Sequence, residues 1–76
     1  MIPKIFGQTL RRHRTEKHLT QEQLAEAADT ALRYIQELEA GTKQPTITTL
    51  FKLAEALGTT PQKLIGPVWT AWKGKR

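Results

Sequence analysis

Apolar residues recur along this chain at spacings of three and four. The clearest run is Leu50, Leu53, Ala54 and Leu57, which would lie on one face of a helix. Phe6 and Leu10 form a similar pair near the N-terminus. No segment alternates between apolar and polar residues over the length of a strand, the pattern typical of a half-buried sheet. The pattern predicts an all-α fold.

Threonine, glycine and proline residues mark the ends of the expected helices. Thr20 is followed three residues later by Gln23, as in a capping box. Gly41 and Gly58 stand where the third and fourth helices should end, and Pro61 suits a first helical position. The threonines expected as N-caps are Thr20, Thr30, Thr46 and Thr60. The predicted helices span 4–17, 21–28, 31–40, 47–57 and 61–65.

The chain of 76 residues is short enough for one domain, which we assign to residues 1–66. Residues 67–76, PVWTAWKGKR, follow Gly66 and Pro67 and form a basic, tryptophan-containing tail. Trp69 and Trp72 can share one face of a helical turn. Three roles stay open for them: packing on the domain, contact with a second subunit, or a place in a flexible tail. The tail's basic residues either follow DNA or only add solubility; they are Lys73, Lys75 and Arg76.

The formal net charge is +5, which attracts polyanions such as nucleic acid, although many small basic proteins bind none. The charge is uneven. Residues 1–19 carry five basic side chains against one acidic side chain, whereas residues 20–42 carry one basic against five acidic. Attraction to phosphate would therefore come largely from elements that flank residues 20–42.

Residues 20–41, TQEQLAEAADTALRYIQELEAG, predict two short helices joined by a tight turn. Their apolar positions would face each other, which leaves the opposite side of the second helix exposed. A projecting helix on a small basic domain is the usual geometry for reading the major groove of DNA.

Four segments in order carry a family resemblance: LRRHR before TQEQLA, then RYIQELEAG, then KQP, then TLFKLAEALG. With them, residues 5–65 resemble the phage-repressor/Cro (XRE) helix-turn-helix family. The resemblance implies a compact five-helix, lambda-repressor-like domain that binds double-stranded DNA as a homodimer. His18 and Asp29 replace glycines common in the family, and aspartate tolerates the left-handed conformation better than most residues.

The resemblance also implies the site residues. Gln21 matches a phosphate-contacting position at the start of the second helix, and Gln36 lies among the outward positions of the third. Arg14 and Glu39 match an internal ion pair that ties the first helix to the third. The outward positions that face bases are Leu32, Arg33, Tyr34 and Glu37, and the following loop that touches the DNA backbone holds Thr42, Lys43 and Gln44.

The side chains of the third helix suit base contacts. Arg33 can bond guanine O6 and N7, Glu37 can accept from cytosine N4, and Leu32 can touch a thymine methyl group. Structural roles remain open for each: an ion pair between Arg33 and Glu37, exposure without function for Leu32, and packing for Tyr34.

Nothing in the sequence indicates catalysis. The only histidines are His13 and His18, and there is no cysteine, which argues against a metal site. No phosphate-binding loop, nucleophile elbow or HExxH string occurs. There is no secretory signal or long apolar run, so we expect a cytoplasmic protein without a cofactor, a membrane contact or a small-molecule ligand.

These observations predict a sequence-specific, repressor-like transcriptional regulator. The alternative is a protein-interaction adaptor or antitoxin-type module with the same fold, which the acidic balance of residues 20–42 favours. A stand-alone repressor and a restriction–modification controller fit the sequence equally well.

Overall fold

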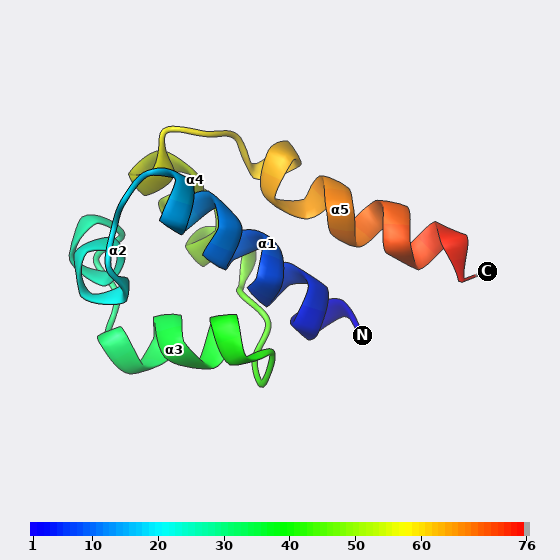
Figure 1. Cartoon of the computed structure of the whole chain (residues 1–76), viewed down its shortest axis with the longest axis horizontal. Helices are drawn as coiled ribbons and strands as arrows, with labels where there is room; N and C mark the ends of the chain where they lie inside the picture. Colours follow the sequence, from blue (N-terminus) through cyan, green and yellow to red (C-terminus); the bar gives the residue numbers. More distant parts are fainter. Residues whose placement is uncertain (76) are drawn as a thin grey trace.

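The computed structural model describes residues 1–75, and these residues form α-helices joined by short loops (Figure 1). The all-α prediction is confirmed over this range, and Arg76 lies outside it. The first four predicted helices are correct to within two residues at each end. The helices are α1 (Ile2–Glu16), α2 (Gln21–Ala27), α3 (Leu32–Ala40), α4 (Ile47–Leu57) and α5 (Pro61–Gly74).

Three of the four predicted threonine caps are present. The Thr20 hydroxyl accepts from the Gln23 amide at 3.0 Å, and the Gln23 side chain accepts in return from the Thr20 amide at 2.9 Å, which completes the capping box. Thr46 and Thr60 cap α4 and α5 in the same way. Each cap satisfies an amide that the helix itself leaves unpaired.

The predicted cap at Thr30 is wrong. Ala31 is the N-cap of α3 and offers no side-chain hydrogen bond. The Thr30 amide instead donates to the carbonyl of Ala25 at 2.9 Å and closes the end of α2. Asp29 adopts the left-handed conformation, with φ of 54°, so the turn forms without the family's glycine. Because Asp29 and Thr30 complete the turn, the N-cap of α3 is Ala31, one residue after the predicted position.

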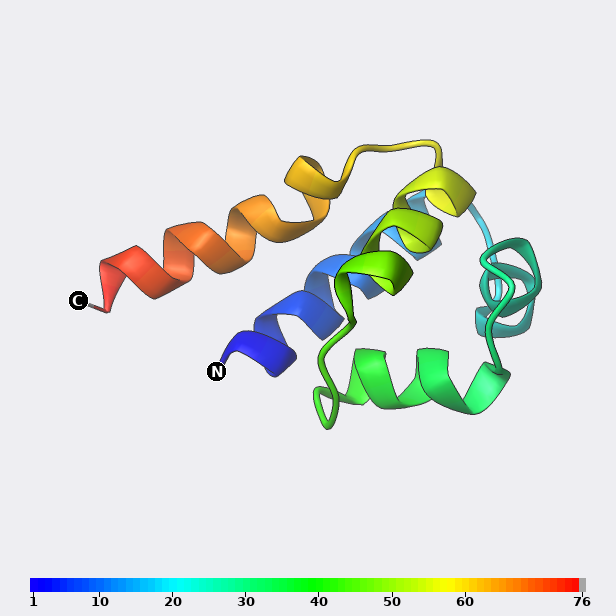
Figure 2. The same cartoon turned by 180° about the vertical axis from the view of Figure 1, so that it is seen from behind.

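Helix α5 is much longer than predicted, since it continues to Gly74 instead of ending at residue 65. Pro67 lies inside it, where proline removes one hydrogen bond and usually clashes with the preceding residue. That preceding residue is Gly66, which has no Cβ to clash. Val68 packs against the core, and α5 lies beside α1 in both views (Figures 1 and 2). Tertiary packing therefore carries the helix past the proline.

One apolar core joins all five helices. Its fully buried side chains are Leu10, Leu24, Ile35, Leu38, Leu53, Leu57 and Leu64. Helix α1 crosses α3 closely at Gly7, where an added Cβ would lie 2.3 Å from the carbonyl oxygen of Leu38. Only glycine permits this approach of the two backbones. In the described part of the chain no helix is long and apolar enough to cross a membrane.

Candidate nucleic-acid interface

Helix α3 lies at one edge of the molecule, with α5 on the other side of α1 (Figures 1 and 2). Ile35 and Leu38 face inward and are fully buried. Arg33 and Gln36 face outward and are exposed. Neither the long α5 nor its tryptophans cover this outward surface, so α3 is open to a partner along its length.

A hydrogen-bonded network holds α3 in place from behind. Arg14 of α1 donates two hydrogen bonds to the carboxylate of Glu39, from Nε at 2.6 Å and from Nη2 at 3.0 Å. The Arg14 and Glu39 side chains are only 11% and 4% exposed. Arg14 Nη1 also donates to the carbonyl of Leu19 at 2.8 Å. The pair implied by the family resemblance therefore links α1, its following loop and α3.

Gln21, at the start of α2, belongs to the same network, because its Nε2 donates to Glu39 Oε1 at 3.0 Å. This bond uses one of the two amide protons and leaves the other free. The hydrogen bond with Glu39 raises the pKa of Arg14 above its usual range, against the lowering effect of burial. The guanidinium consequently stays charged at and around neutral pH.

The outward side of α3 carries a second, more exposed network. Glu37 lies between two cations: Lys43 Nζ at 3.2 Å from Oε1, and Arg33 Nε at 3.8 Å from Oε2. Lys43 Nζ also lies 5.9 Å from the centre of the Tyr34 ring, within the range of a cation–π contact. Thr42 donates from both its amide and its hydroxyl to the carbonyl of Glu37, each at 3.1 Å. The loop after α3 is thus tied to the helix by side chain and backbone.

The predicted contact residues differ in how freely they reach solvent. The Arg33 side chain is 87% exposed, and Gln36 and Gln44 are also exposed. Leu32 and Tyr34 are half-buried and pack against the core, so only part of each faces outward. Less of the Leu32 side chain and of the Tyr34 ring is therefore available to DNA than the helical spacing alone predicted.

The acidic balance of residues 20–42 is less unfavourable in three dimensions than in sequence. Glu39 is neutralised internally by Arg14. The exposed carboxylates of Glu22, Glu26 and Asp29 belong to α2 and its turn. On α3 and the loop that follows, the remaining charges are two cations and the carboxylate of Glu37. This surface has a small positive charge.

Comparison with known proteins decides the family. A helix-turn-helix family model matches residues 10–64. The chain is 39% identical over 64 residues to an uncharacterized helix-turn-helix transcriptional regulator, y4dJ, of Sinorhizobium fredii, covering 84% of this chain and 83% of the relative. The chain belongs to the helix-turn-helix family of DNA-binding transcriptional regulators.

Solved structures of helix-turn-helix proteins share this fold. The restriction–modification controller protein C.AhdI from Aeromonas hydrophila superimposes with a TM-score of 0.80 and 37% identity, covering 82% of this chain and 94% of that one. The clp gene regulator ClgR from Corynebacterium glutamicum gives a TM-score of 0.86 and 27% identity, covering 99% of this chain and 80% of that one. The similarity to ClgR includes the extended α5.

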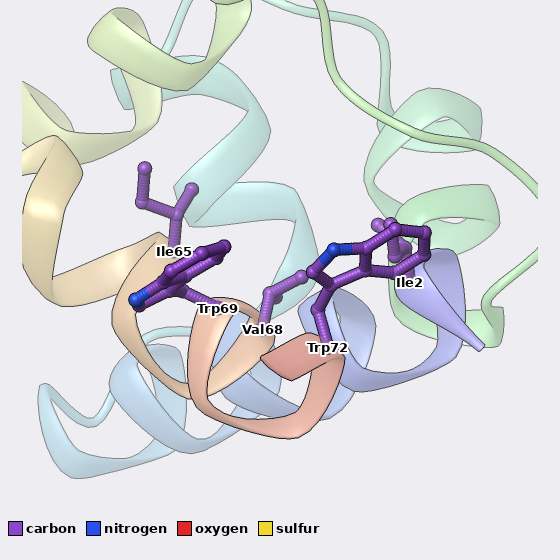
Figure 3. A pocket seen from close by; sticks show the side chains of 5 residues that line it. All are labelled: Ile2, Ile65, Val68, Trp69 and Trp72. Carbon is purple, nitrogen blue, oxygen red and sulfur yellow. The ribbon is translucent and has the colours of Figure 1, made fainter. Parts of the chain in front are cut away.

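This helix-turn-helix protein has a second exposed surface, an apolar one on α5, whose shape the sequence did not predict. Trp69 and Trp72 lie on α5, 54% and 44% exposed, beside Ile2 at the start of α1. With Ile65 and Val68 they line an open hollow of about 290 Å³ (Figure 3). Both tryptophans are therefore held on a packed helix while much of each ring stays uncovered.

Proposed function

We propose that this protein is a sequence-specific, repressor-like transcriptional regulator that acts in the cytoplasm and places α3 in the major groove of double-stranded DNA. The observation that carries the proposal is the open outward surface of α3, anchored from behind by the ion pair between Arg14 and Glu39. A helix that reads base edges must project from the domain and must be held rigidly.

Several side chains on and beside this surface have distinct roles in that docking. Arg33 is free to bond a guanine, and Gln36 lies beside it on the exposed side of α3. In the loop after α3, Thr42, Lys43 and Gln44 contact the DNA backbone. Gln21 offers its second amide proton to a phosphate, while its first stays on Glu39. Phosphate contacts of this kind set the position of the helix, and base contacts supply specificity.

We propose that the protein acts as a homodimer. Residues 1–66 form the DNA-binding unit, and residues 67–75 help to hold the second copy. The apolar hollow at Trp69 and Trp72 continues into a neighbouring one of about 180 Å³ that includes Ile2, Ile65 and Val68 in its lining. Residues 64–72 carry no charged side chain. An uncharged apolar face is self-complementary, as a two-fold interface requires.

Selection from a pool of random duplexes by the purified protein tests this function. We expect an enriched palindrome whose half-sites lie ~34–36 Å apart, one turn of DNA. Affinity for the selected site should fall steeply as salt rises, because bound phosphates release counterions. A protein-interaction adaptor would enrich no motif and prefer no duplex at any salt concentration.

Sedimentation equilibrium tests the homodimer separately. Trp69→Ser should weaken self-association, whereas Thr70→Ser, at the next position of α5, which is also exposed, should leave it unchanged. Equal dissociation constants for the two variants would exclude the tryptophan face as the interface between copies.

A further inference from the structure

We infer that Glu37 makes this protein reject non-target DNA. Its carboxylate pairs with the Lys43 ammonium group until a base with an exposed amino group replaces Lys43 as the partner of Glu37. The inference rests on the proposed function. It assigns Glu37 a specificity-determining role that works through Lys43, in addition to any direct contact with a base.

The charges around α3 support this role. Within residues 32–46 the charged side chains are Arg33, Glu37, Glu39 and Lys43, and Glu39 is committed to Arg14. Glu37 is consequently the one carboxylate available to both exposed cations, and it lies within 4.0 Å of each. A phosphate that binds Lys43 must therefore compete with Glu37 for its ammonium group.

The ion pair with Lys43 is the better formed of the two. Its 3.2 Å separation compares with 3.8 Å for Arg33, and Lys43 is 53% exposed whereas Arg33 is 87% exposed. The Tyr34 ring lies near the ammonium group, and Thr42 fixes the loop to the carbonyl of Glu37. Lys43 is thus held in place in the absence of DNA, while the Arg33 side chain is more exposed and more weakly paired.

Docking on DNA changes the balance of these contacts. A phosphate draws Lys43 away and leaves the Glu37 carboxylate unpaired near a polyanion, which is unfavourable. The amino groups of cytosine N4 and adenine N6 are the base-edge donors in the major groove, and either can replace Lys43 as the partner of Glu37. A site that lacks such a donor offers no compensation, so Glu37 acts against wrong sequences.

The expected effect follows from counterion release. One additional phosphate contact steepens the slope of log affinity against log salt by ~0.9. Between 1 M and 0.1 M salt, one such contact therefore strengthens binding about 8-fold. Glu37→Gln keeps the size of the side chain and frees Lys43. It should therefore bind random duplex about 8-fold more tightly, with that steeper slope, and should gain less at the selected site.

Two further variants separate this role from a general effect of charge. Glu26→Gln removes the same charge from an exposed position on α2 and should change the affinity for random duplex less than about 2-fold, because no contact with a phosphate is created. Lys43→Gln should lose about 8-fold at the selected site, where Lys43 contacts a phosphate. On random duplex it should lose little, since Glu37 already holds Lys43 there.

Titrations of all four proteins, wild type included, on both duplexes at several salt concentrations measure these differences. A misfolded variant would lose affinity everywhere and cannot imitate a gain on random DNA. The inference is overturned if Glu37→Gln gains no more than Glu26→Gln, or if Lys43→Gln loses equally on both duplexes. In those cases the wild type still binds its selected site, so the proposed function stands; a wild type without duplex binding would overturn both.

Discussion

Replacing Arg14 with alanine should destabilise the protein far more than replacing an exposed charged side chain of the same helix. The substitution removes two hydrogen bonds to Glu39 and one to the carbonyl of Leu19. It also leaves a carboxylate that is only 4% exposed with Gln21 as its remaining side-chain partner. Breaking a buried ion pair from one side costs ~3–5 kcal/mol. We expect ~3 kcal/mol, the lower end of that range, because Gln21 keeps its bond to Glu39.

This loss is large for a chain of 76 residues. At ~0.05–0.15 kcal/mol per residue, the whole free energy of unfolding is ~4–11 kcal/mol. A loss of ~3 kcal/mol should lower the melting temperature by ~12–24 °C. The ionisation of Arg14 itself should add no pH dependence between pH 5 and 9. A group whose pKa is raised by folding stabilises fully below its unfolded pKa and loses this effect only as pH rises through the folded value, and both values for Arg14 lie above that window.

Urea unfolding followed by circular dichroism measures the difference in free energy. Arg12→Ala is the matched control, because Arg12 lies on the same helix and is exposed. Arg14→Lys keeps the charge without the two-pronged geometry and should fall between the wild type and Arg14→Ala. Equal unfolding midpoints for Arg14→Ala and Arg12→Ala would refute the view that this pair holds α3 in place.

Three further changes test other parts of the structure. Gly7→Ala should destabilise by ~1–3 kcal/mol, because its Cβ would press on a backbone carbonyl of α3; Gly74→Ala, which has open space at the end of α5, should cost much less in the same urea assay. Thr20→Ala should lose ~1 kcal/mol with the capping box, whereas Thr48→Ala, at an exposed site in α4, should not; equal melting curves would contradict the cap. Arg33→Ala should weaken binding to the selected site by ~1–3 kcal/mol and relax one base position, measured by repeating the selection. Equal weakening on every sequence would instead make Arg33 a phosphate contact.

Local signals in the sequence correctly predicted the helix ends that are determined by hydrogen bonds between neighbouring residues. The capping box of Thr20 and Gln23 and the left-handed glycines Gly41 and Gly58 are all present as predicted. These features involve residues three or four apart, so their energies are decided by short-range hydrogen bonds. Thr30 is the exception, because its amide closes the previous helix instead of leaving its hydroxyl to open the next.

Packing between distant segments determined the features that the local sequence pattern did not predict. Gly66 and Pro67 resemble a helix end in sequence, yet contact with α1 makes the longer α5 favourable. Gly7 carried no recognisable signal, because its role depends on a carbonyl 31 residues later in the chain. Tyr34 and Leu32 share the outward spacing of Arg33, but the packing of α3 turns them partly inward.

The sequence by itself determined the family, the helical class and the identity of the helix that faces outward, because periodic burial and capping are properties of single segments. The family resemblance also implied the internal pair of Arg14 and Glu39. Only the tertiary structure decided that Glu37 lies nearer to Lys43 than to Arg33. That choice depends on distances between separate segments, which no one-dimensional pattern contains.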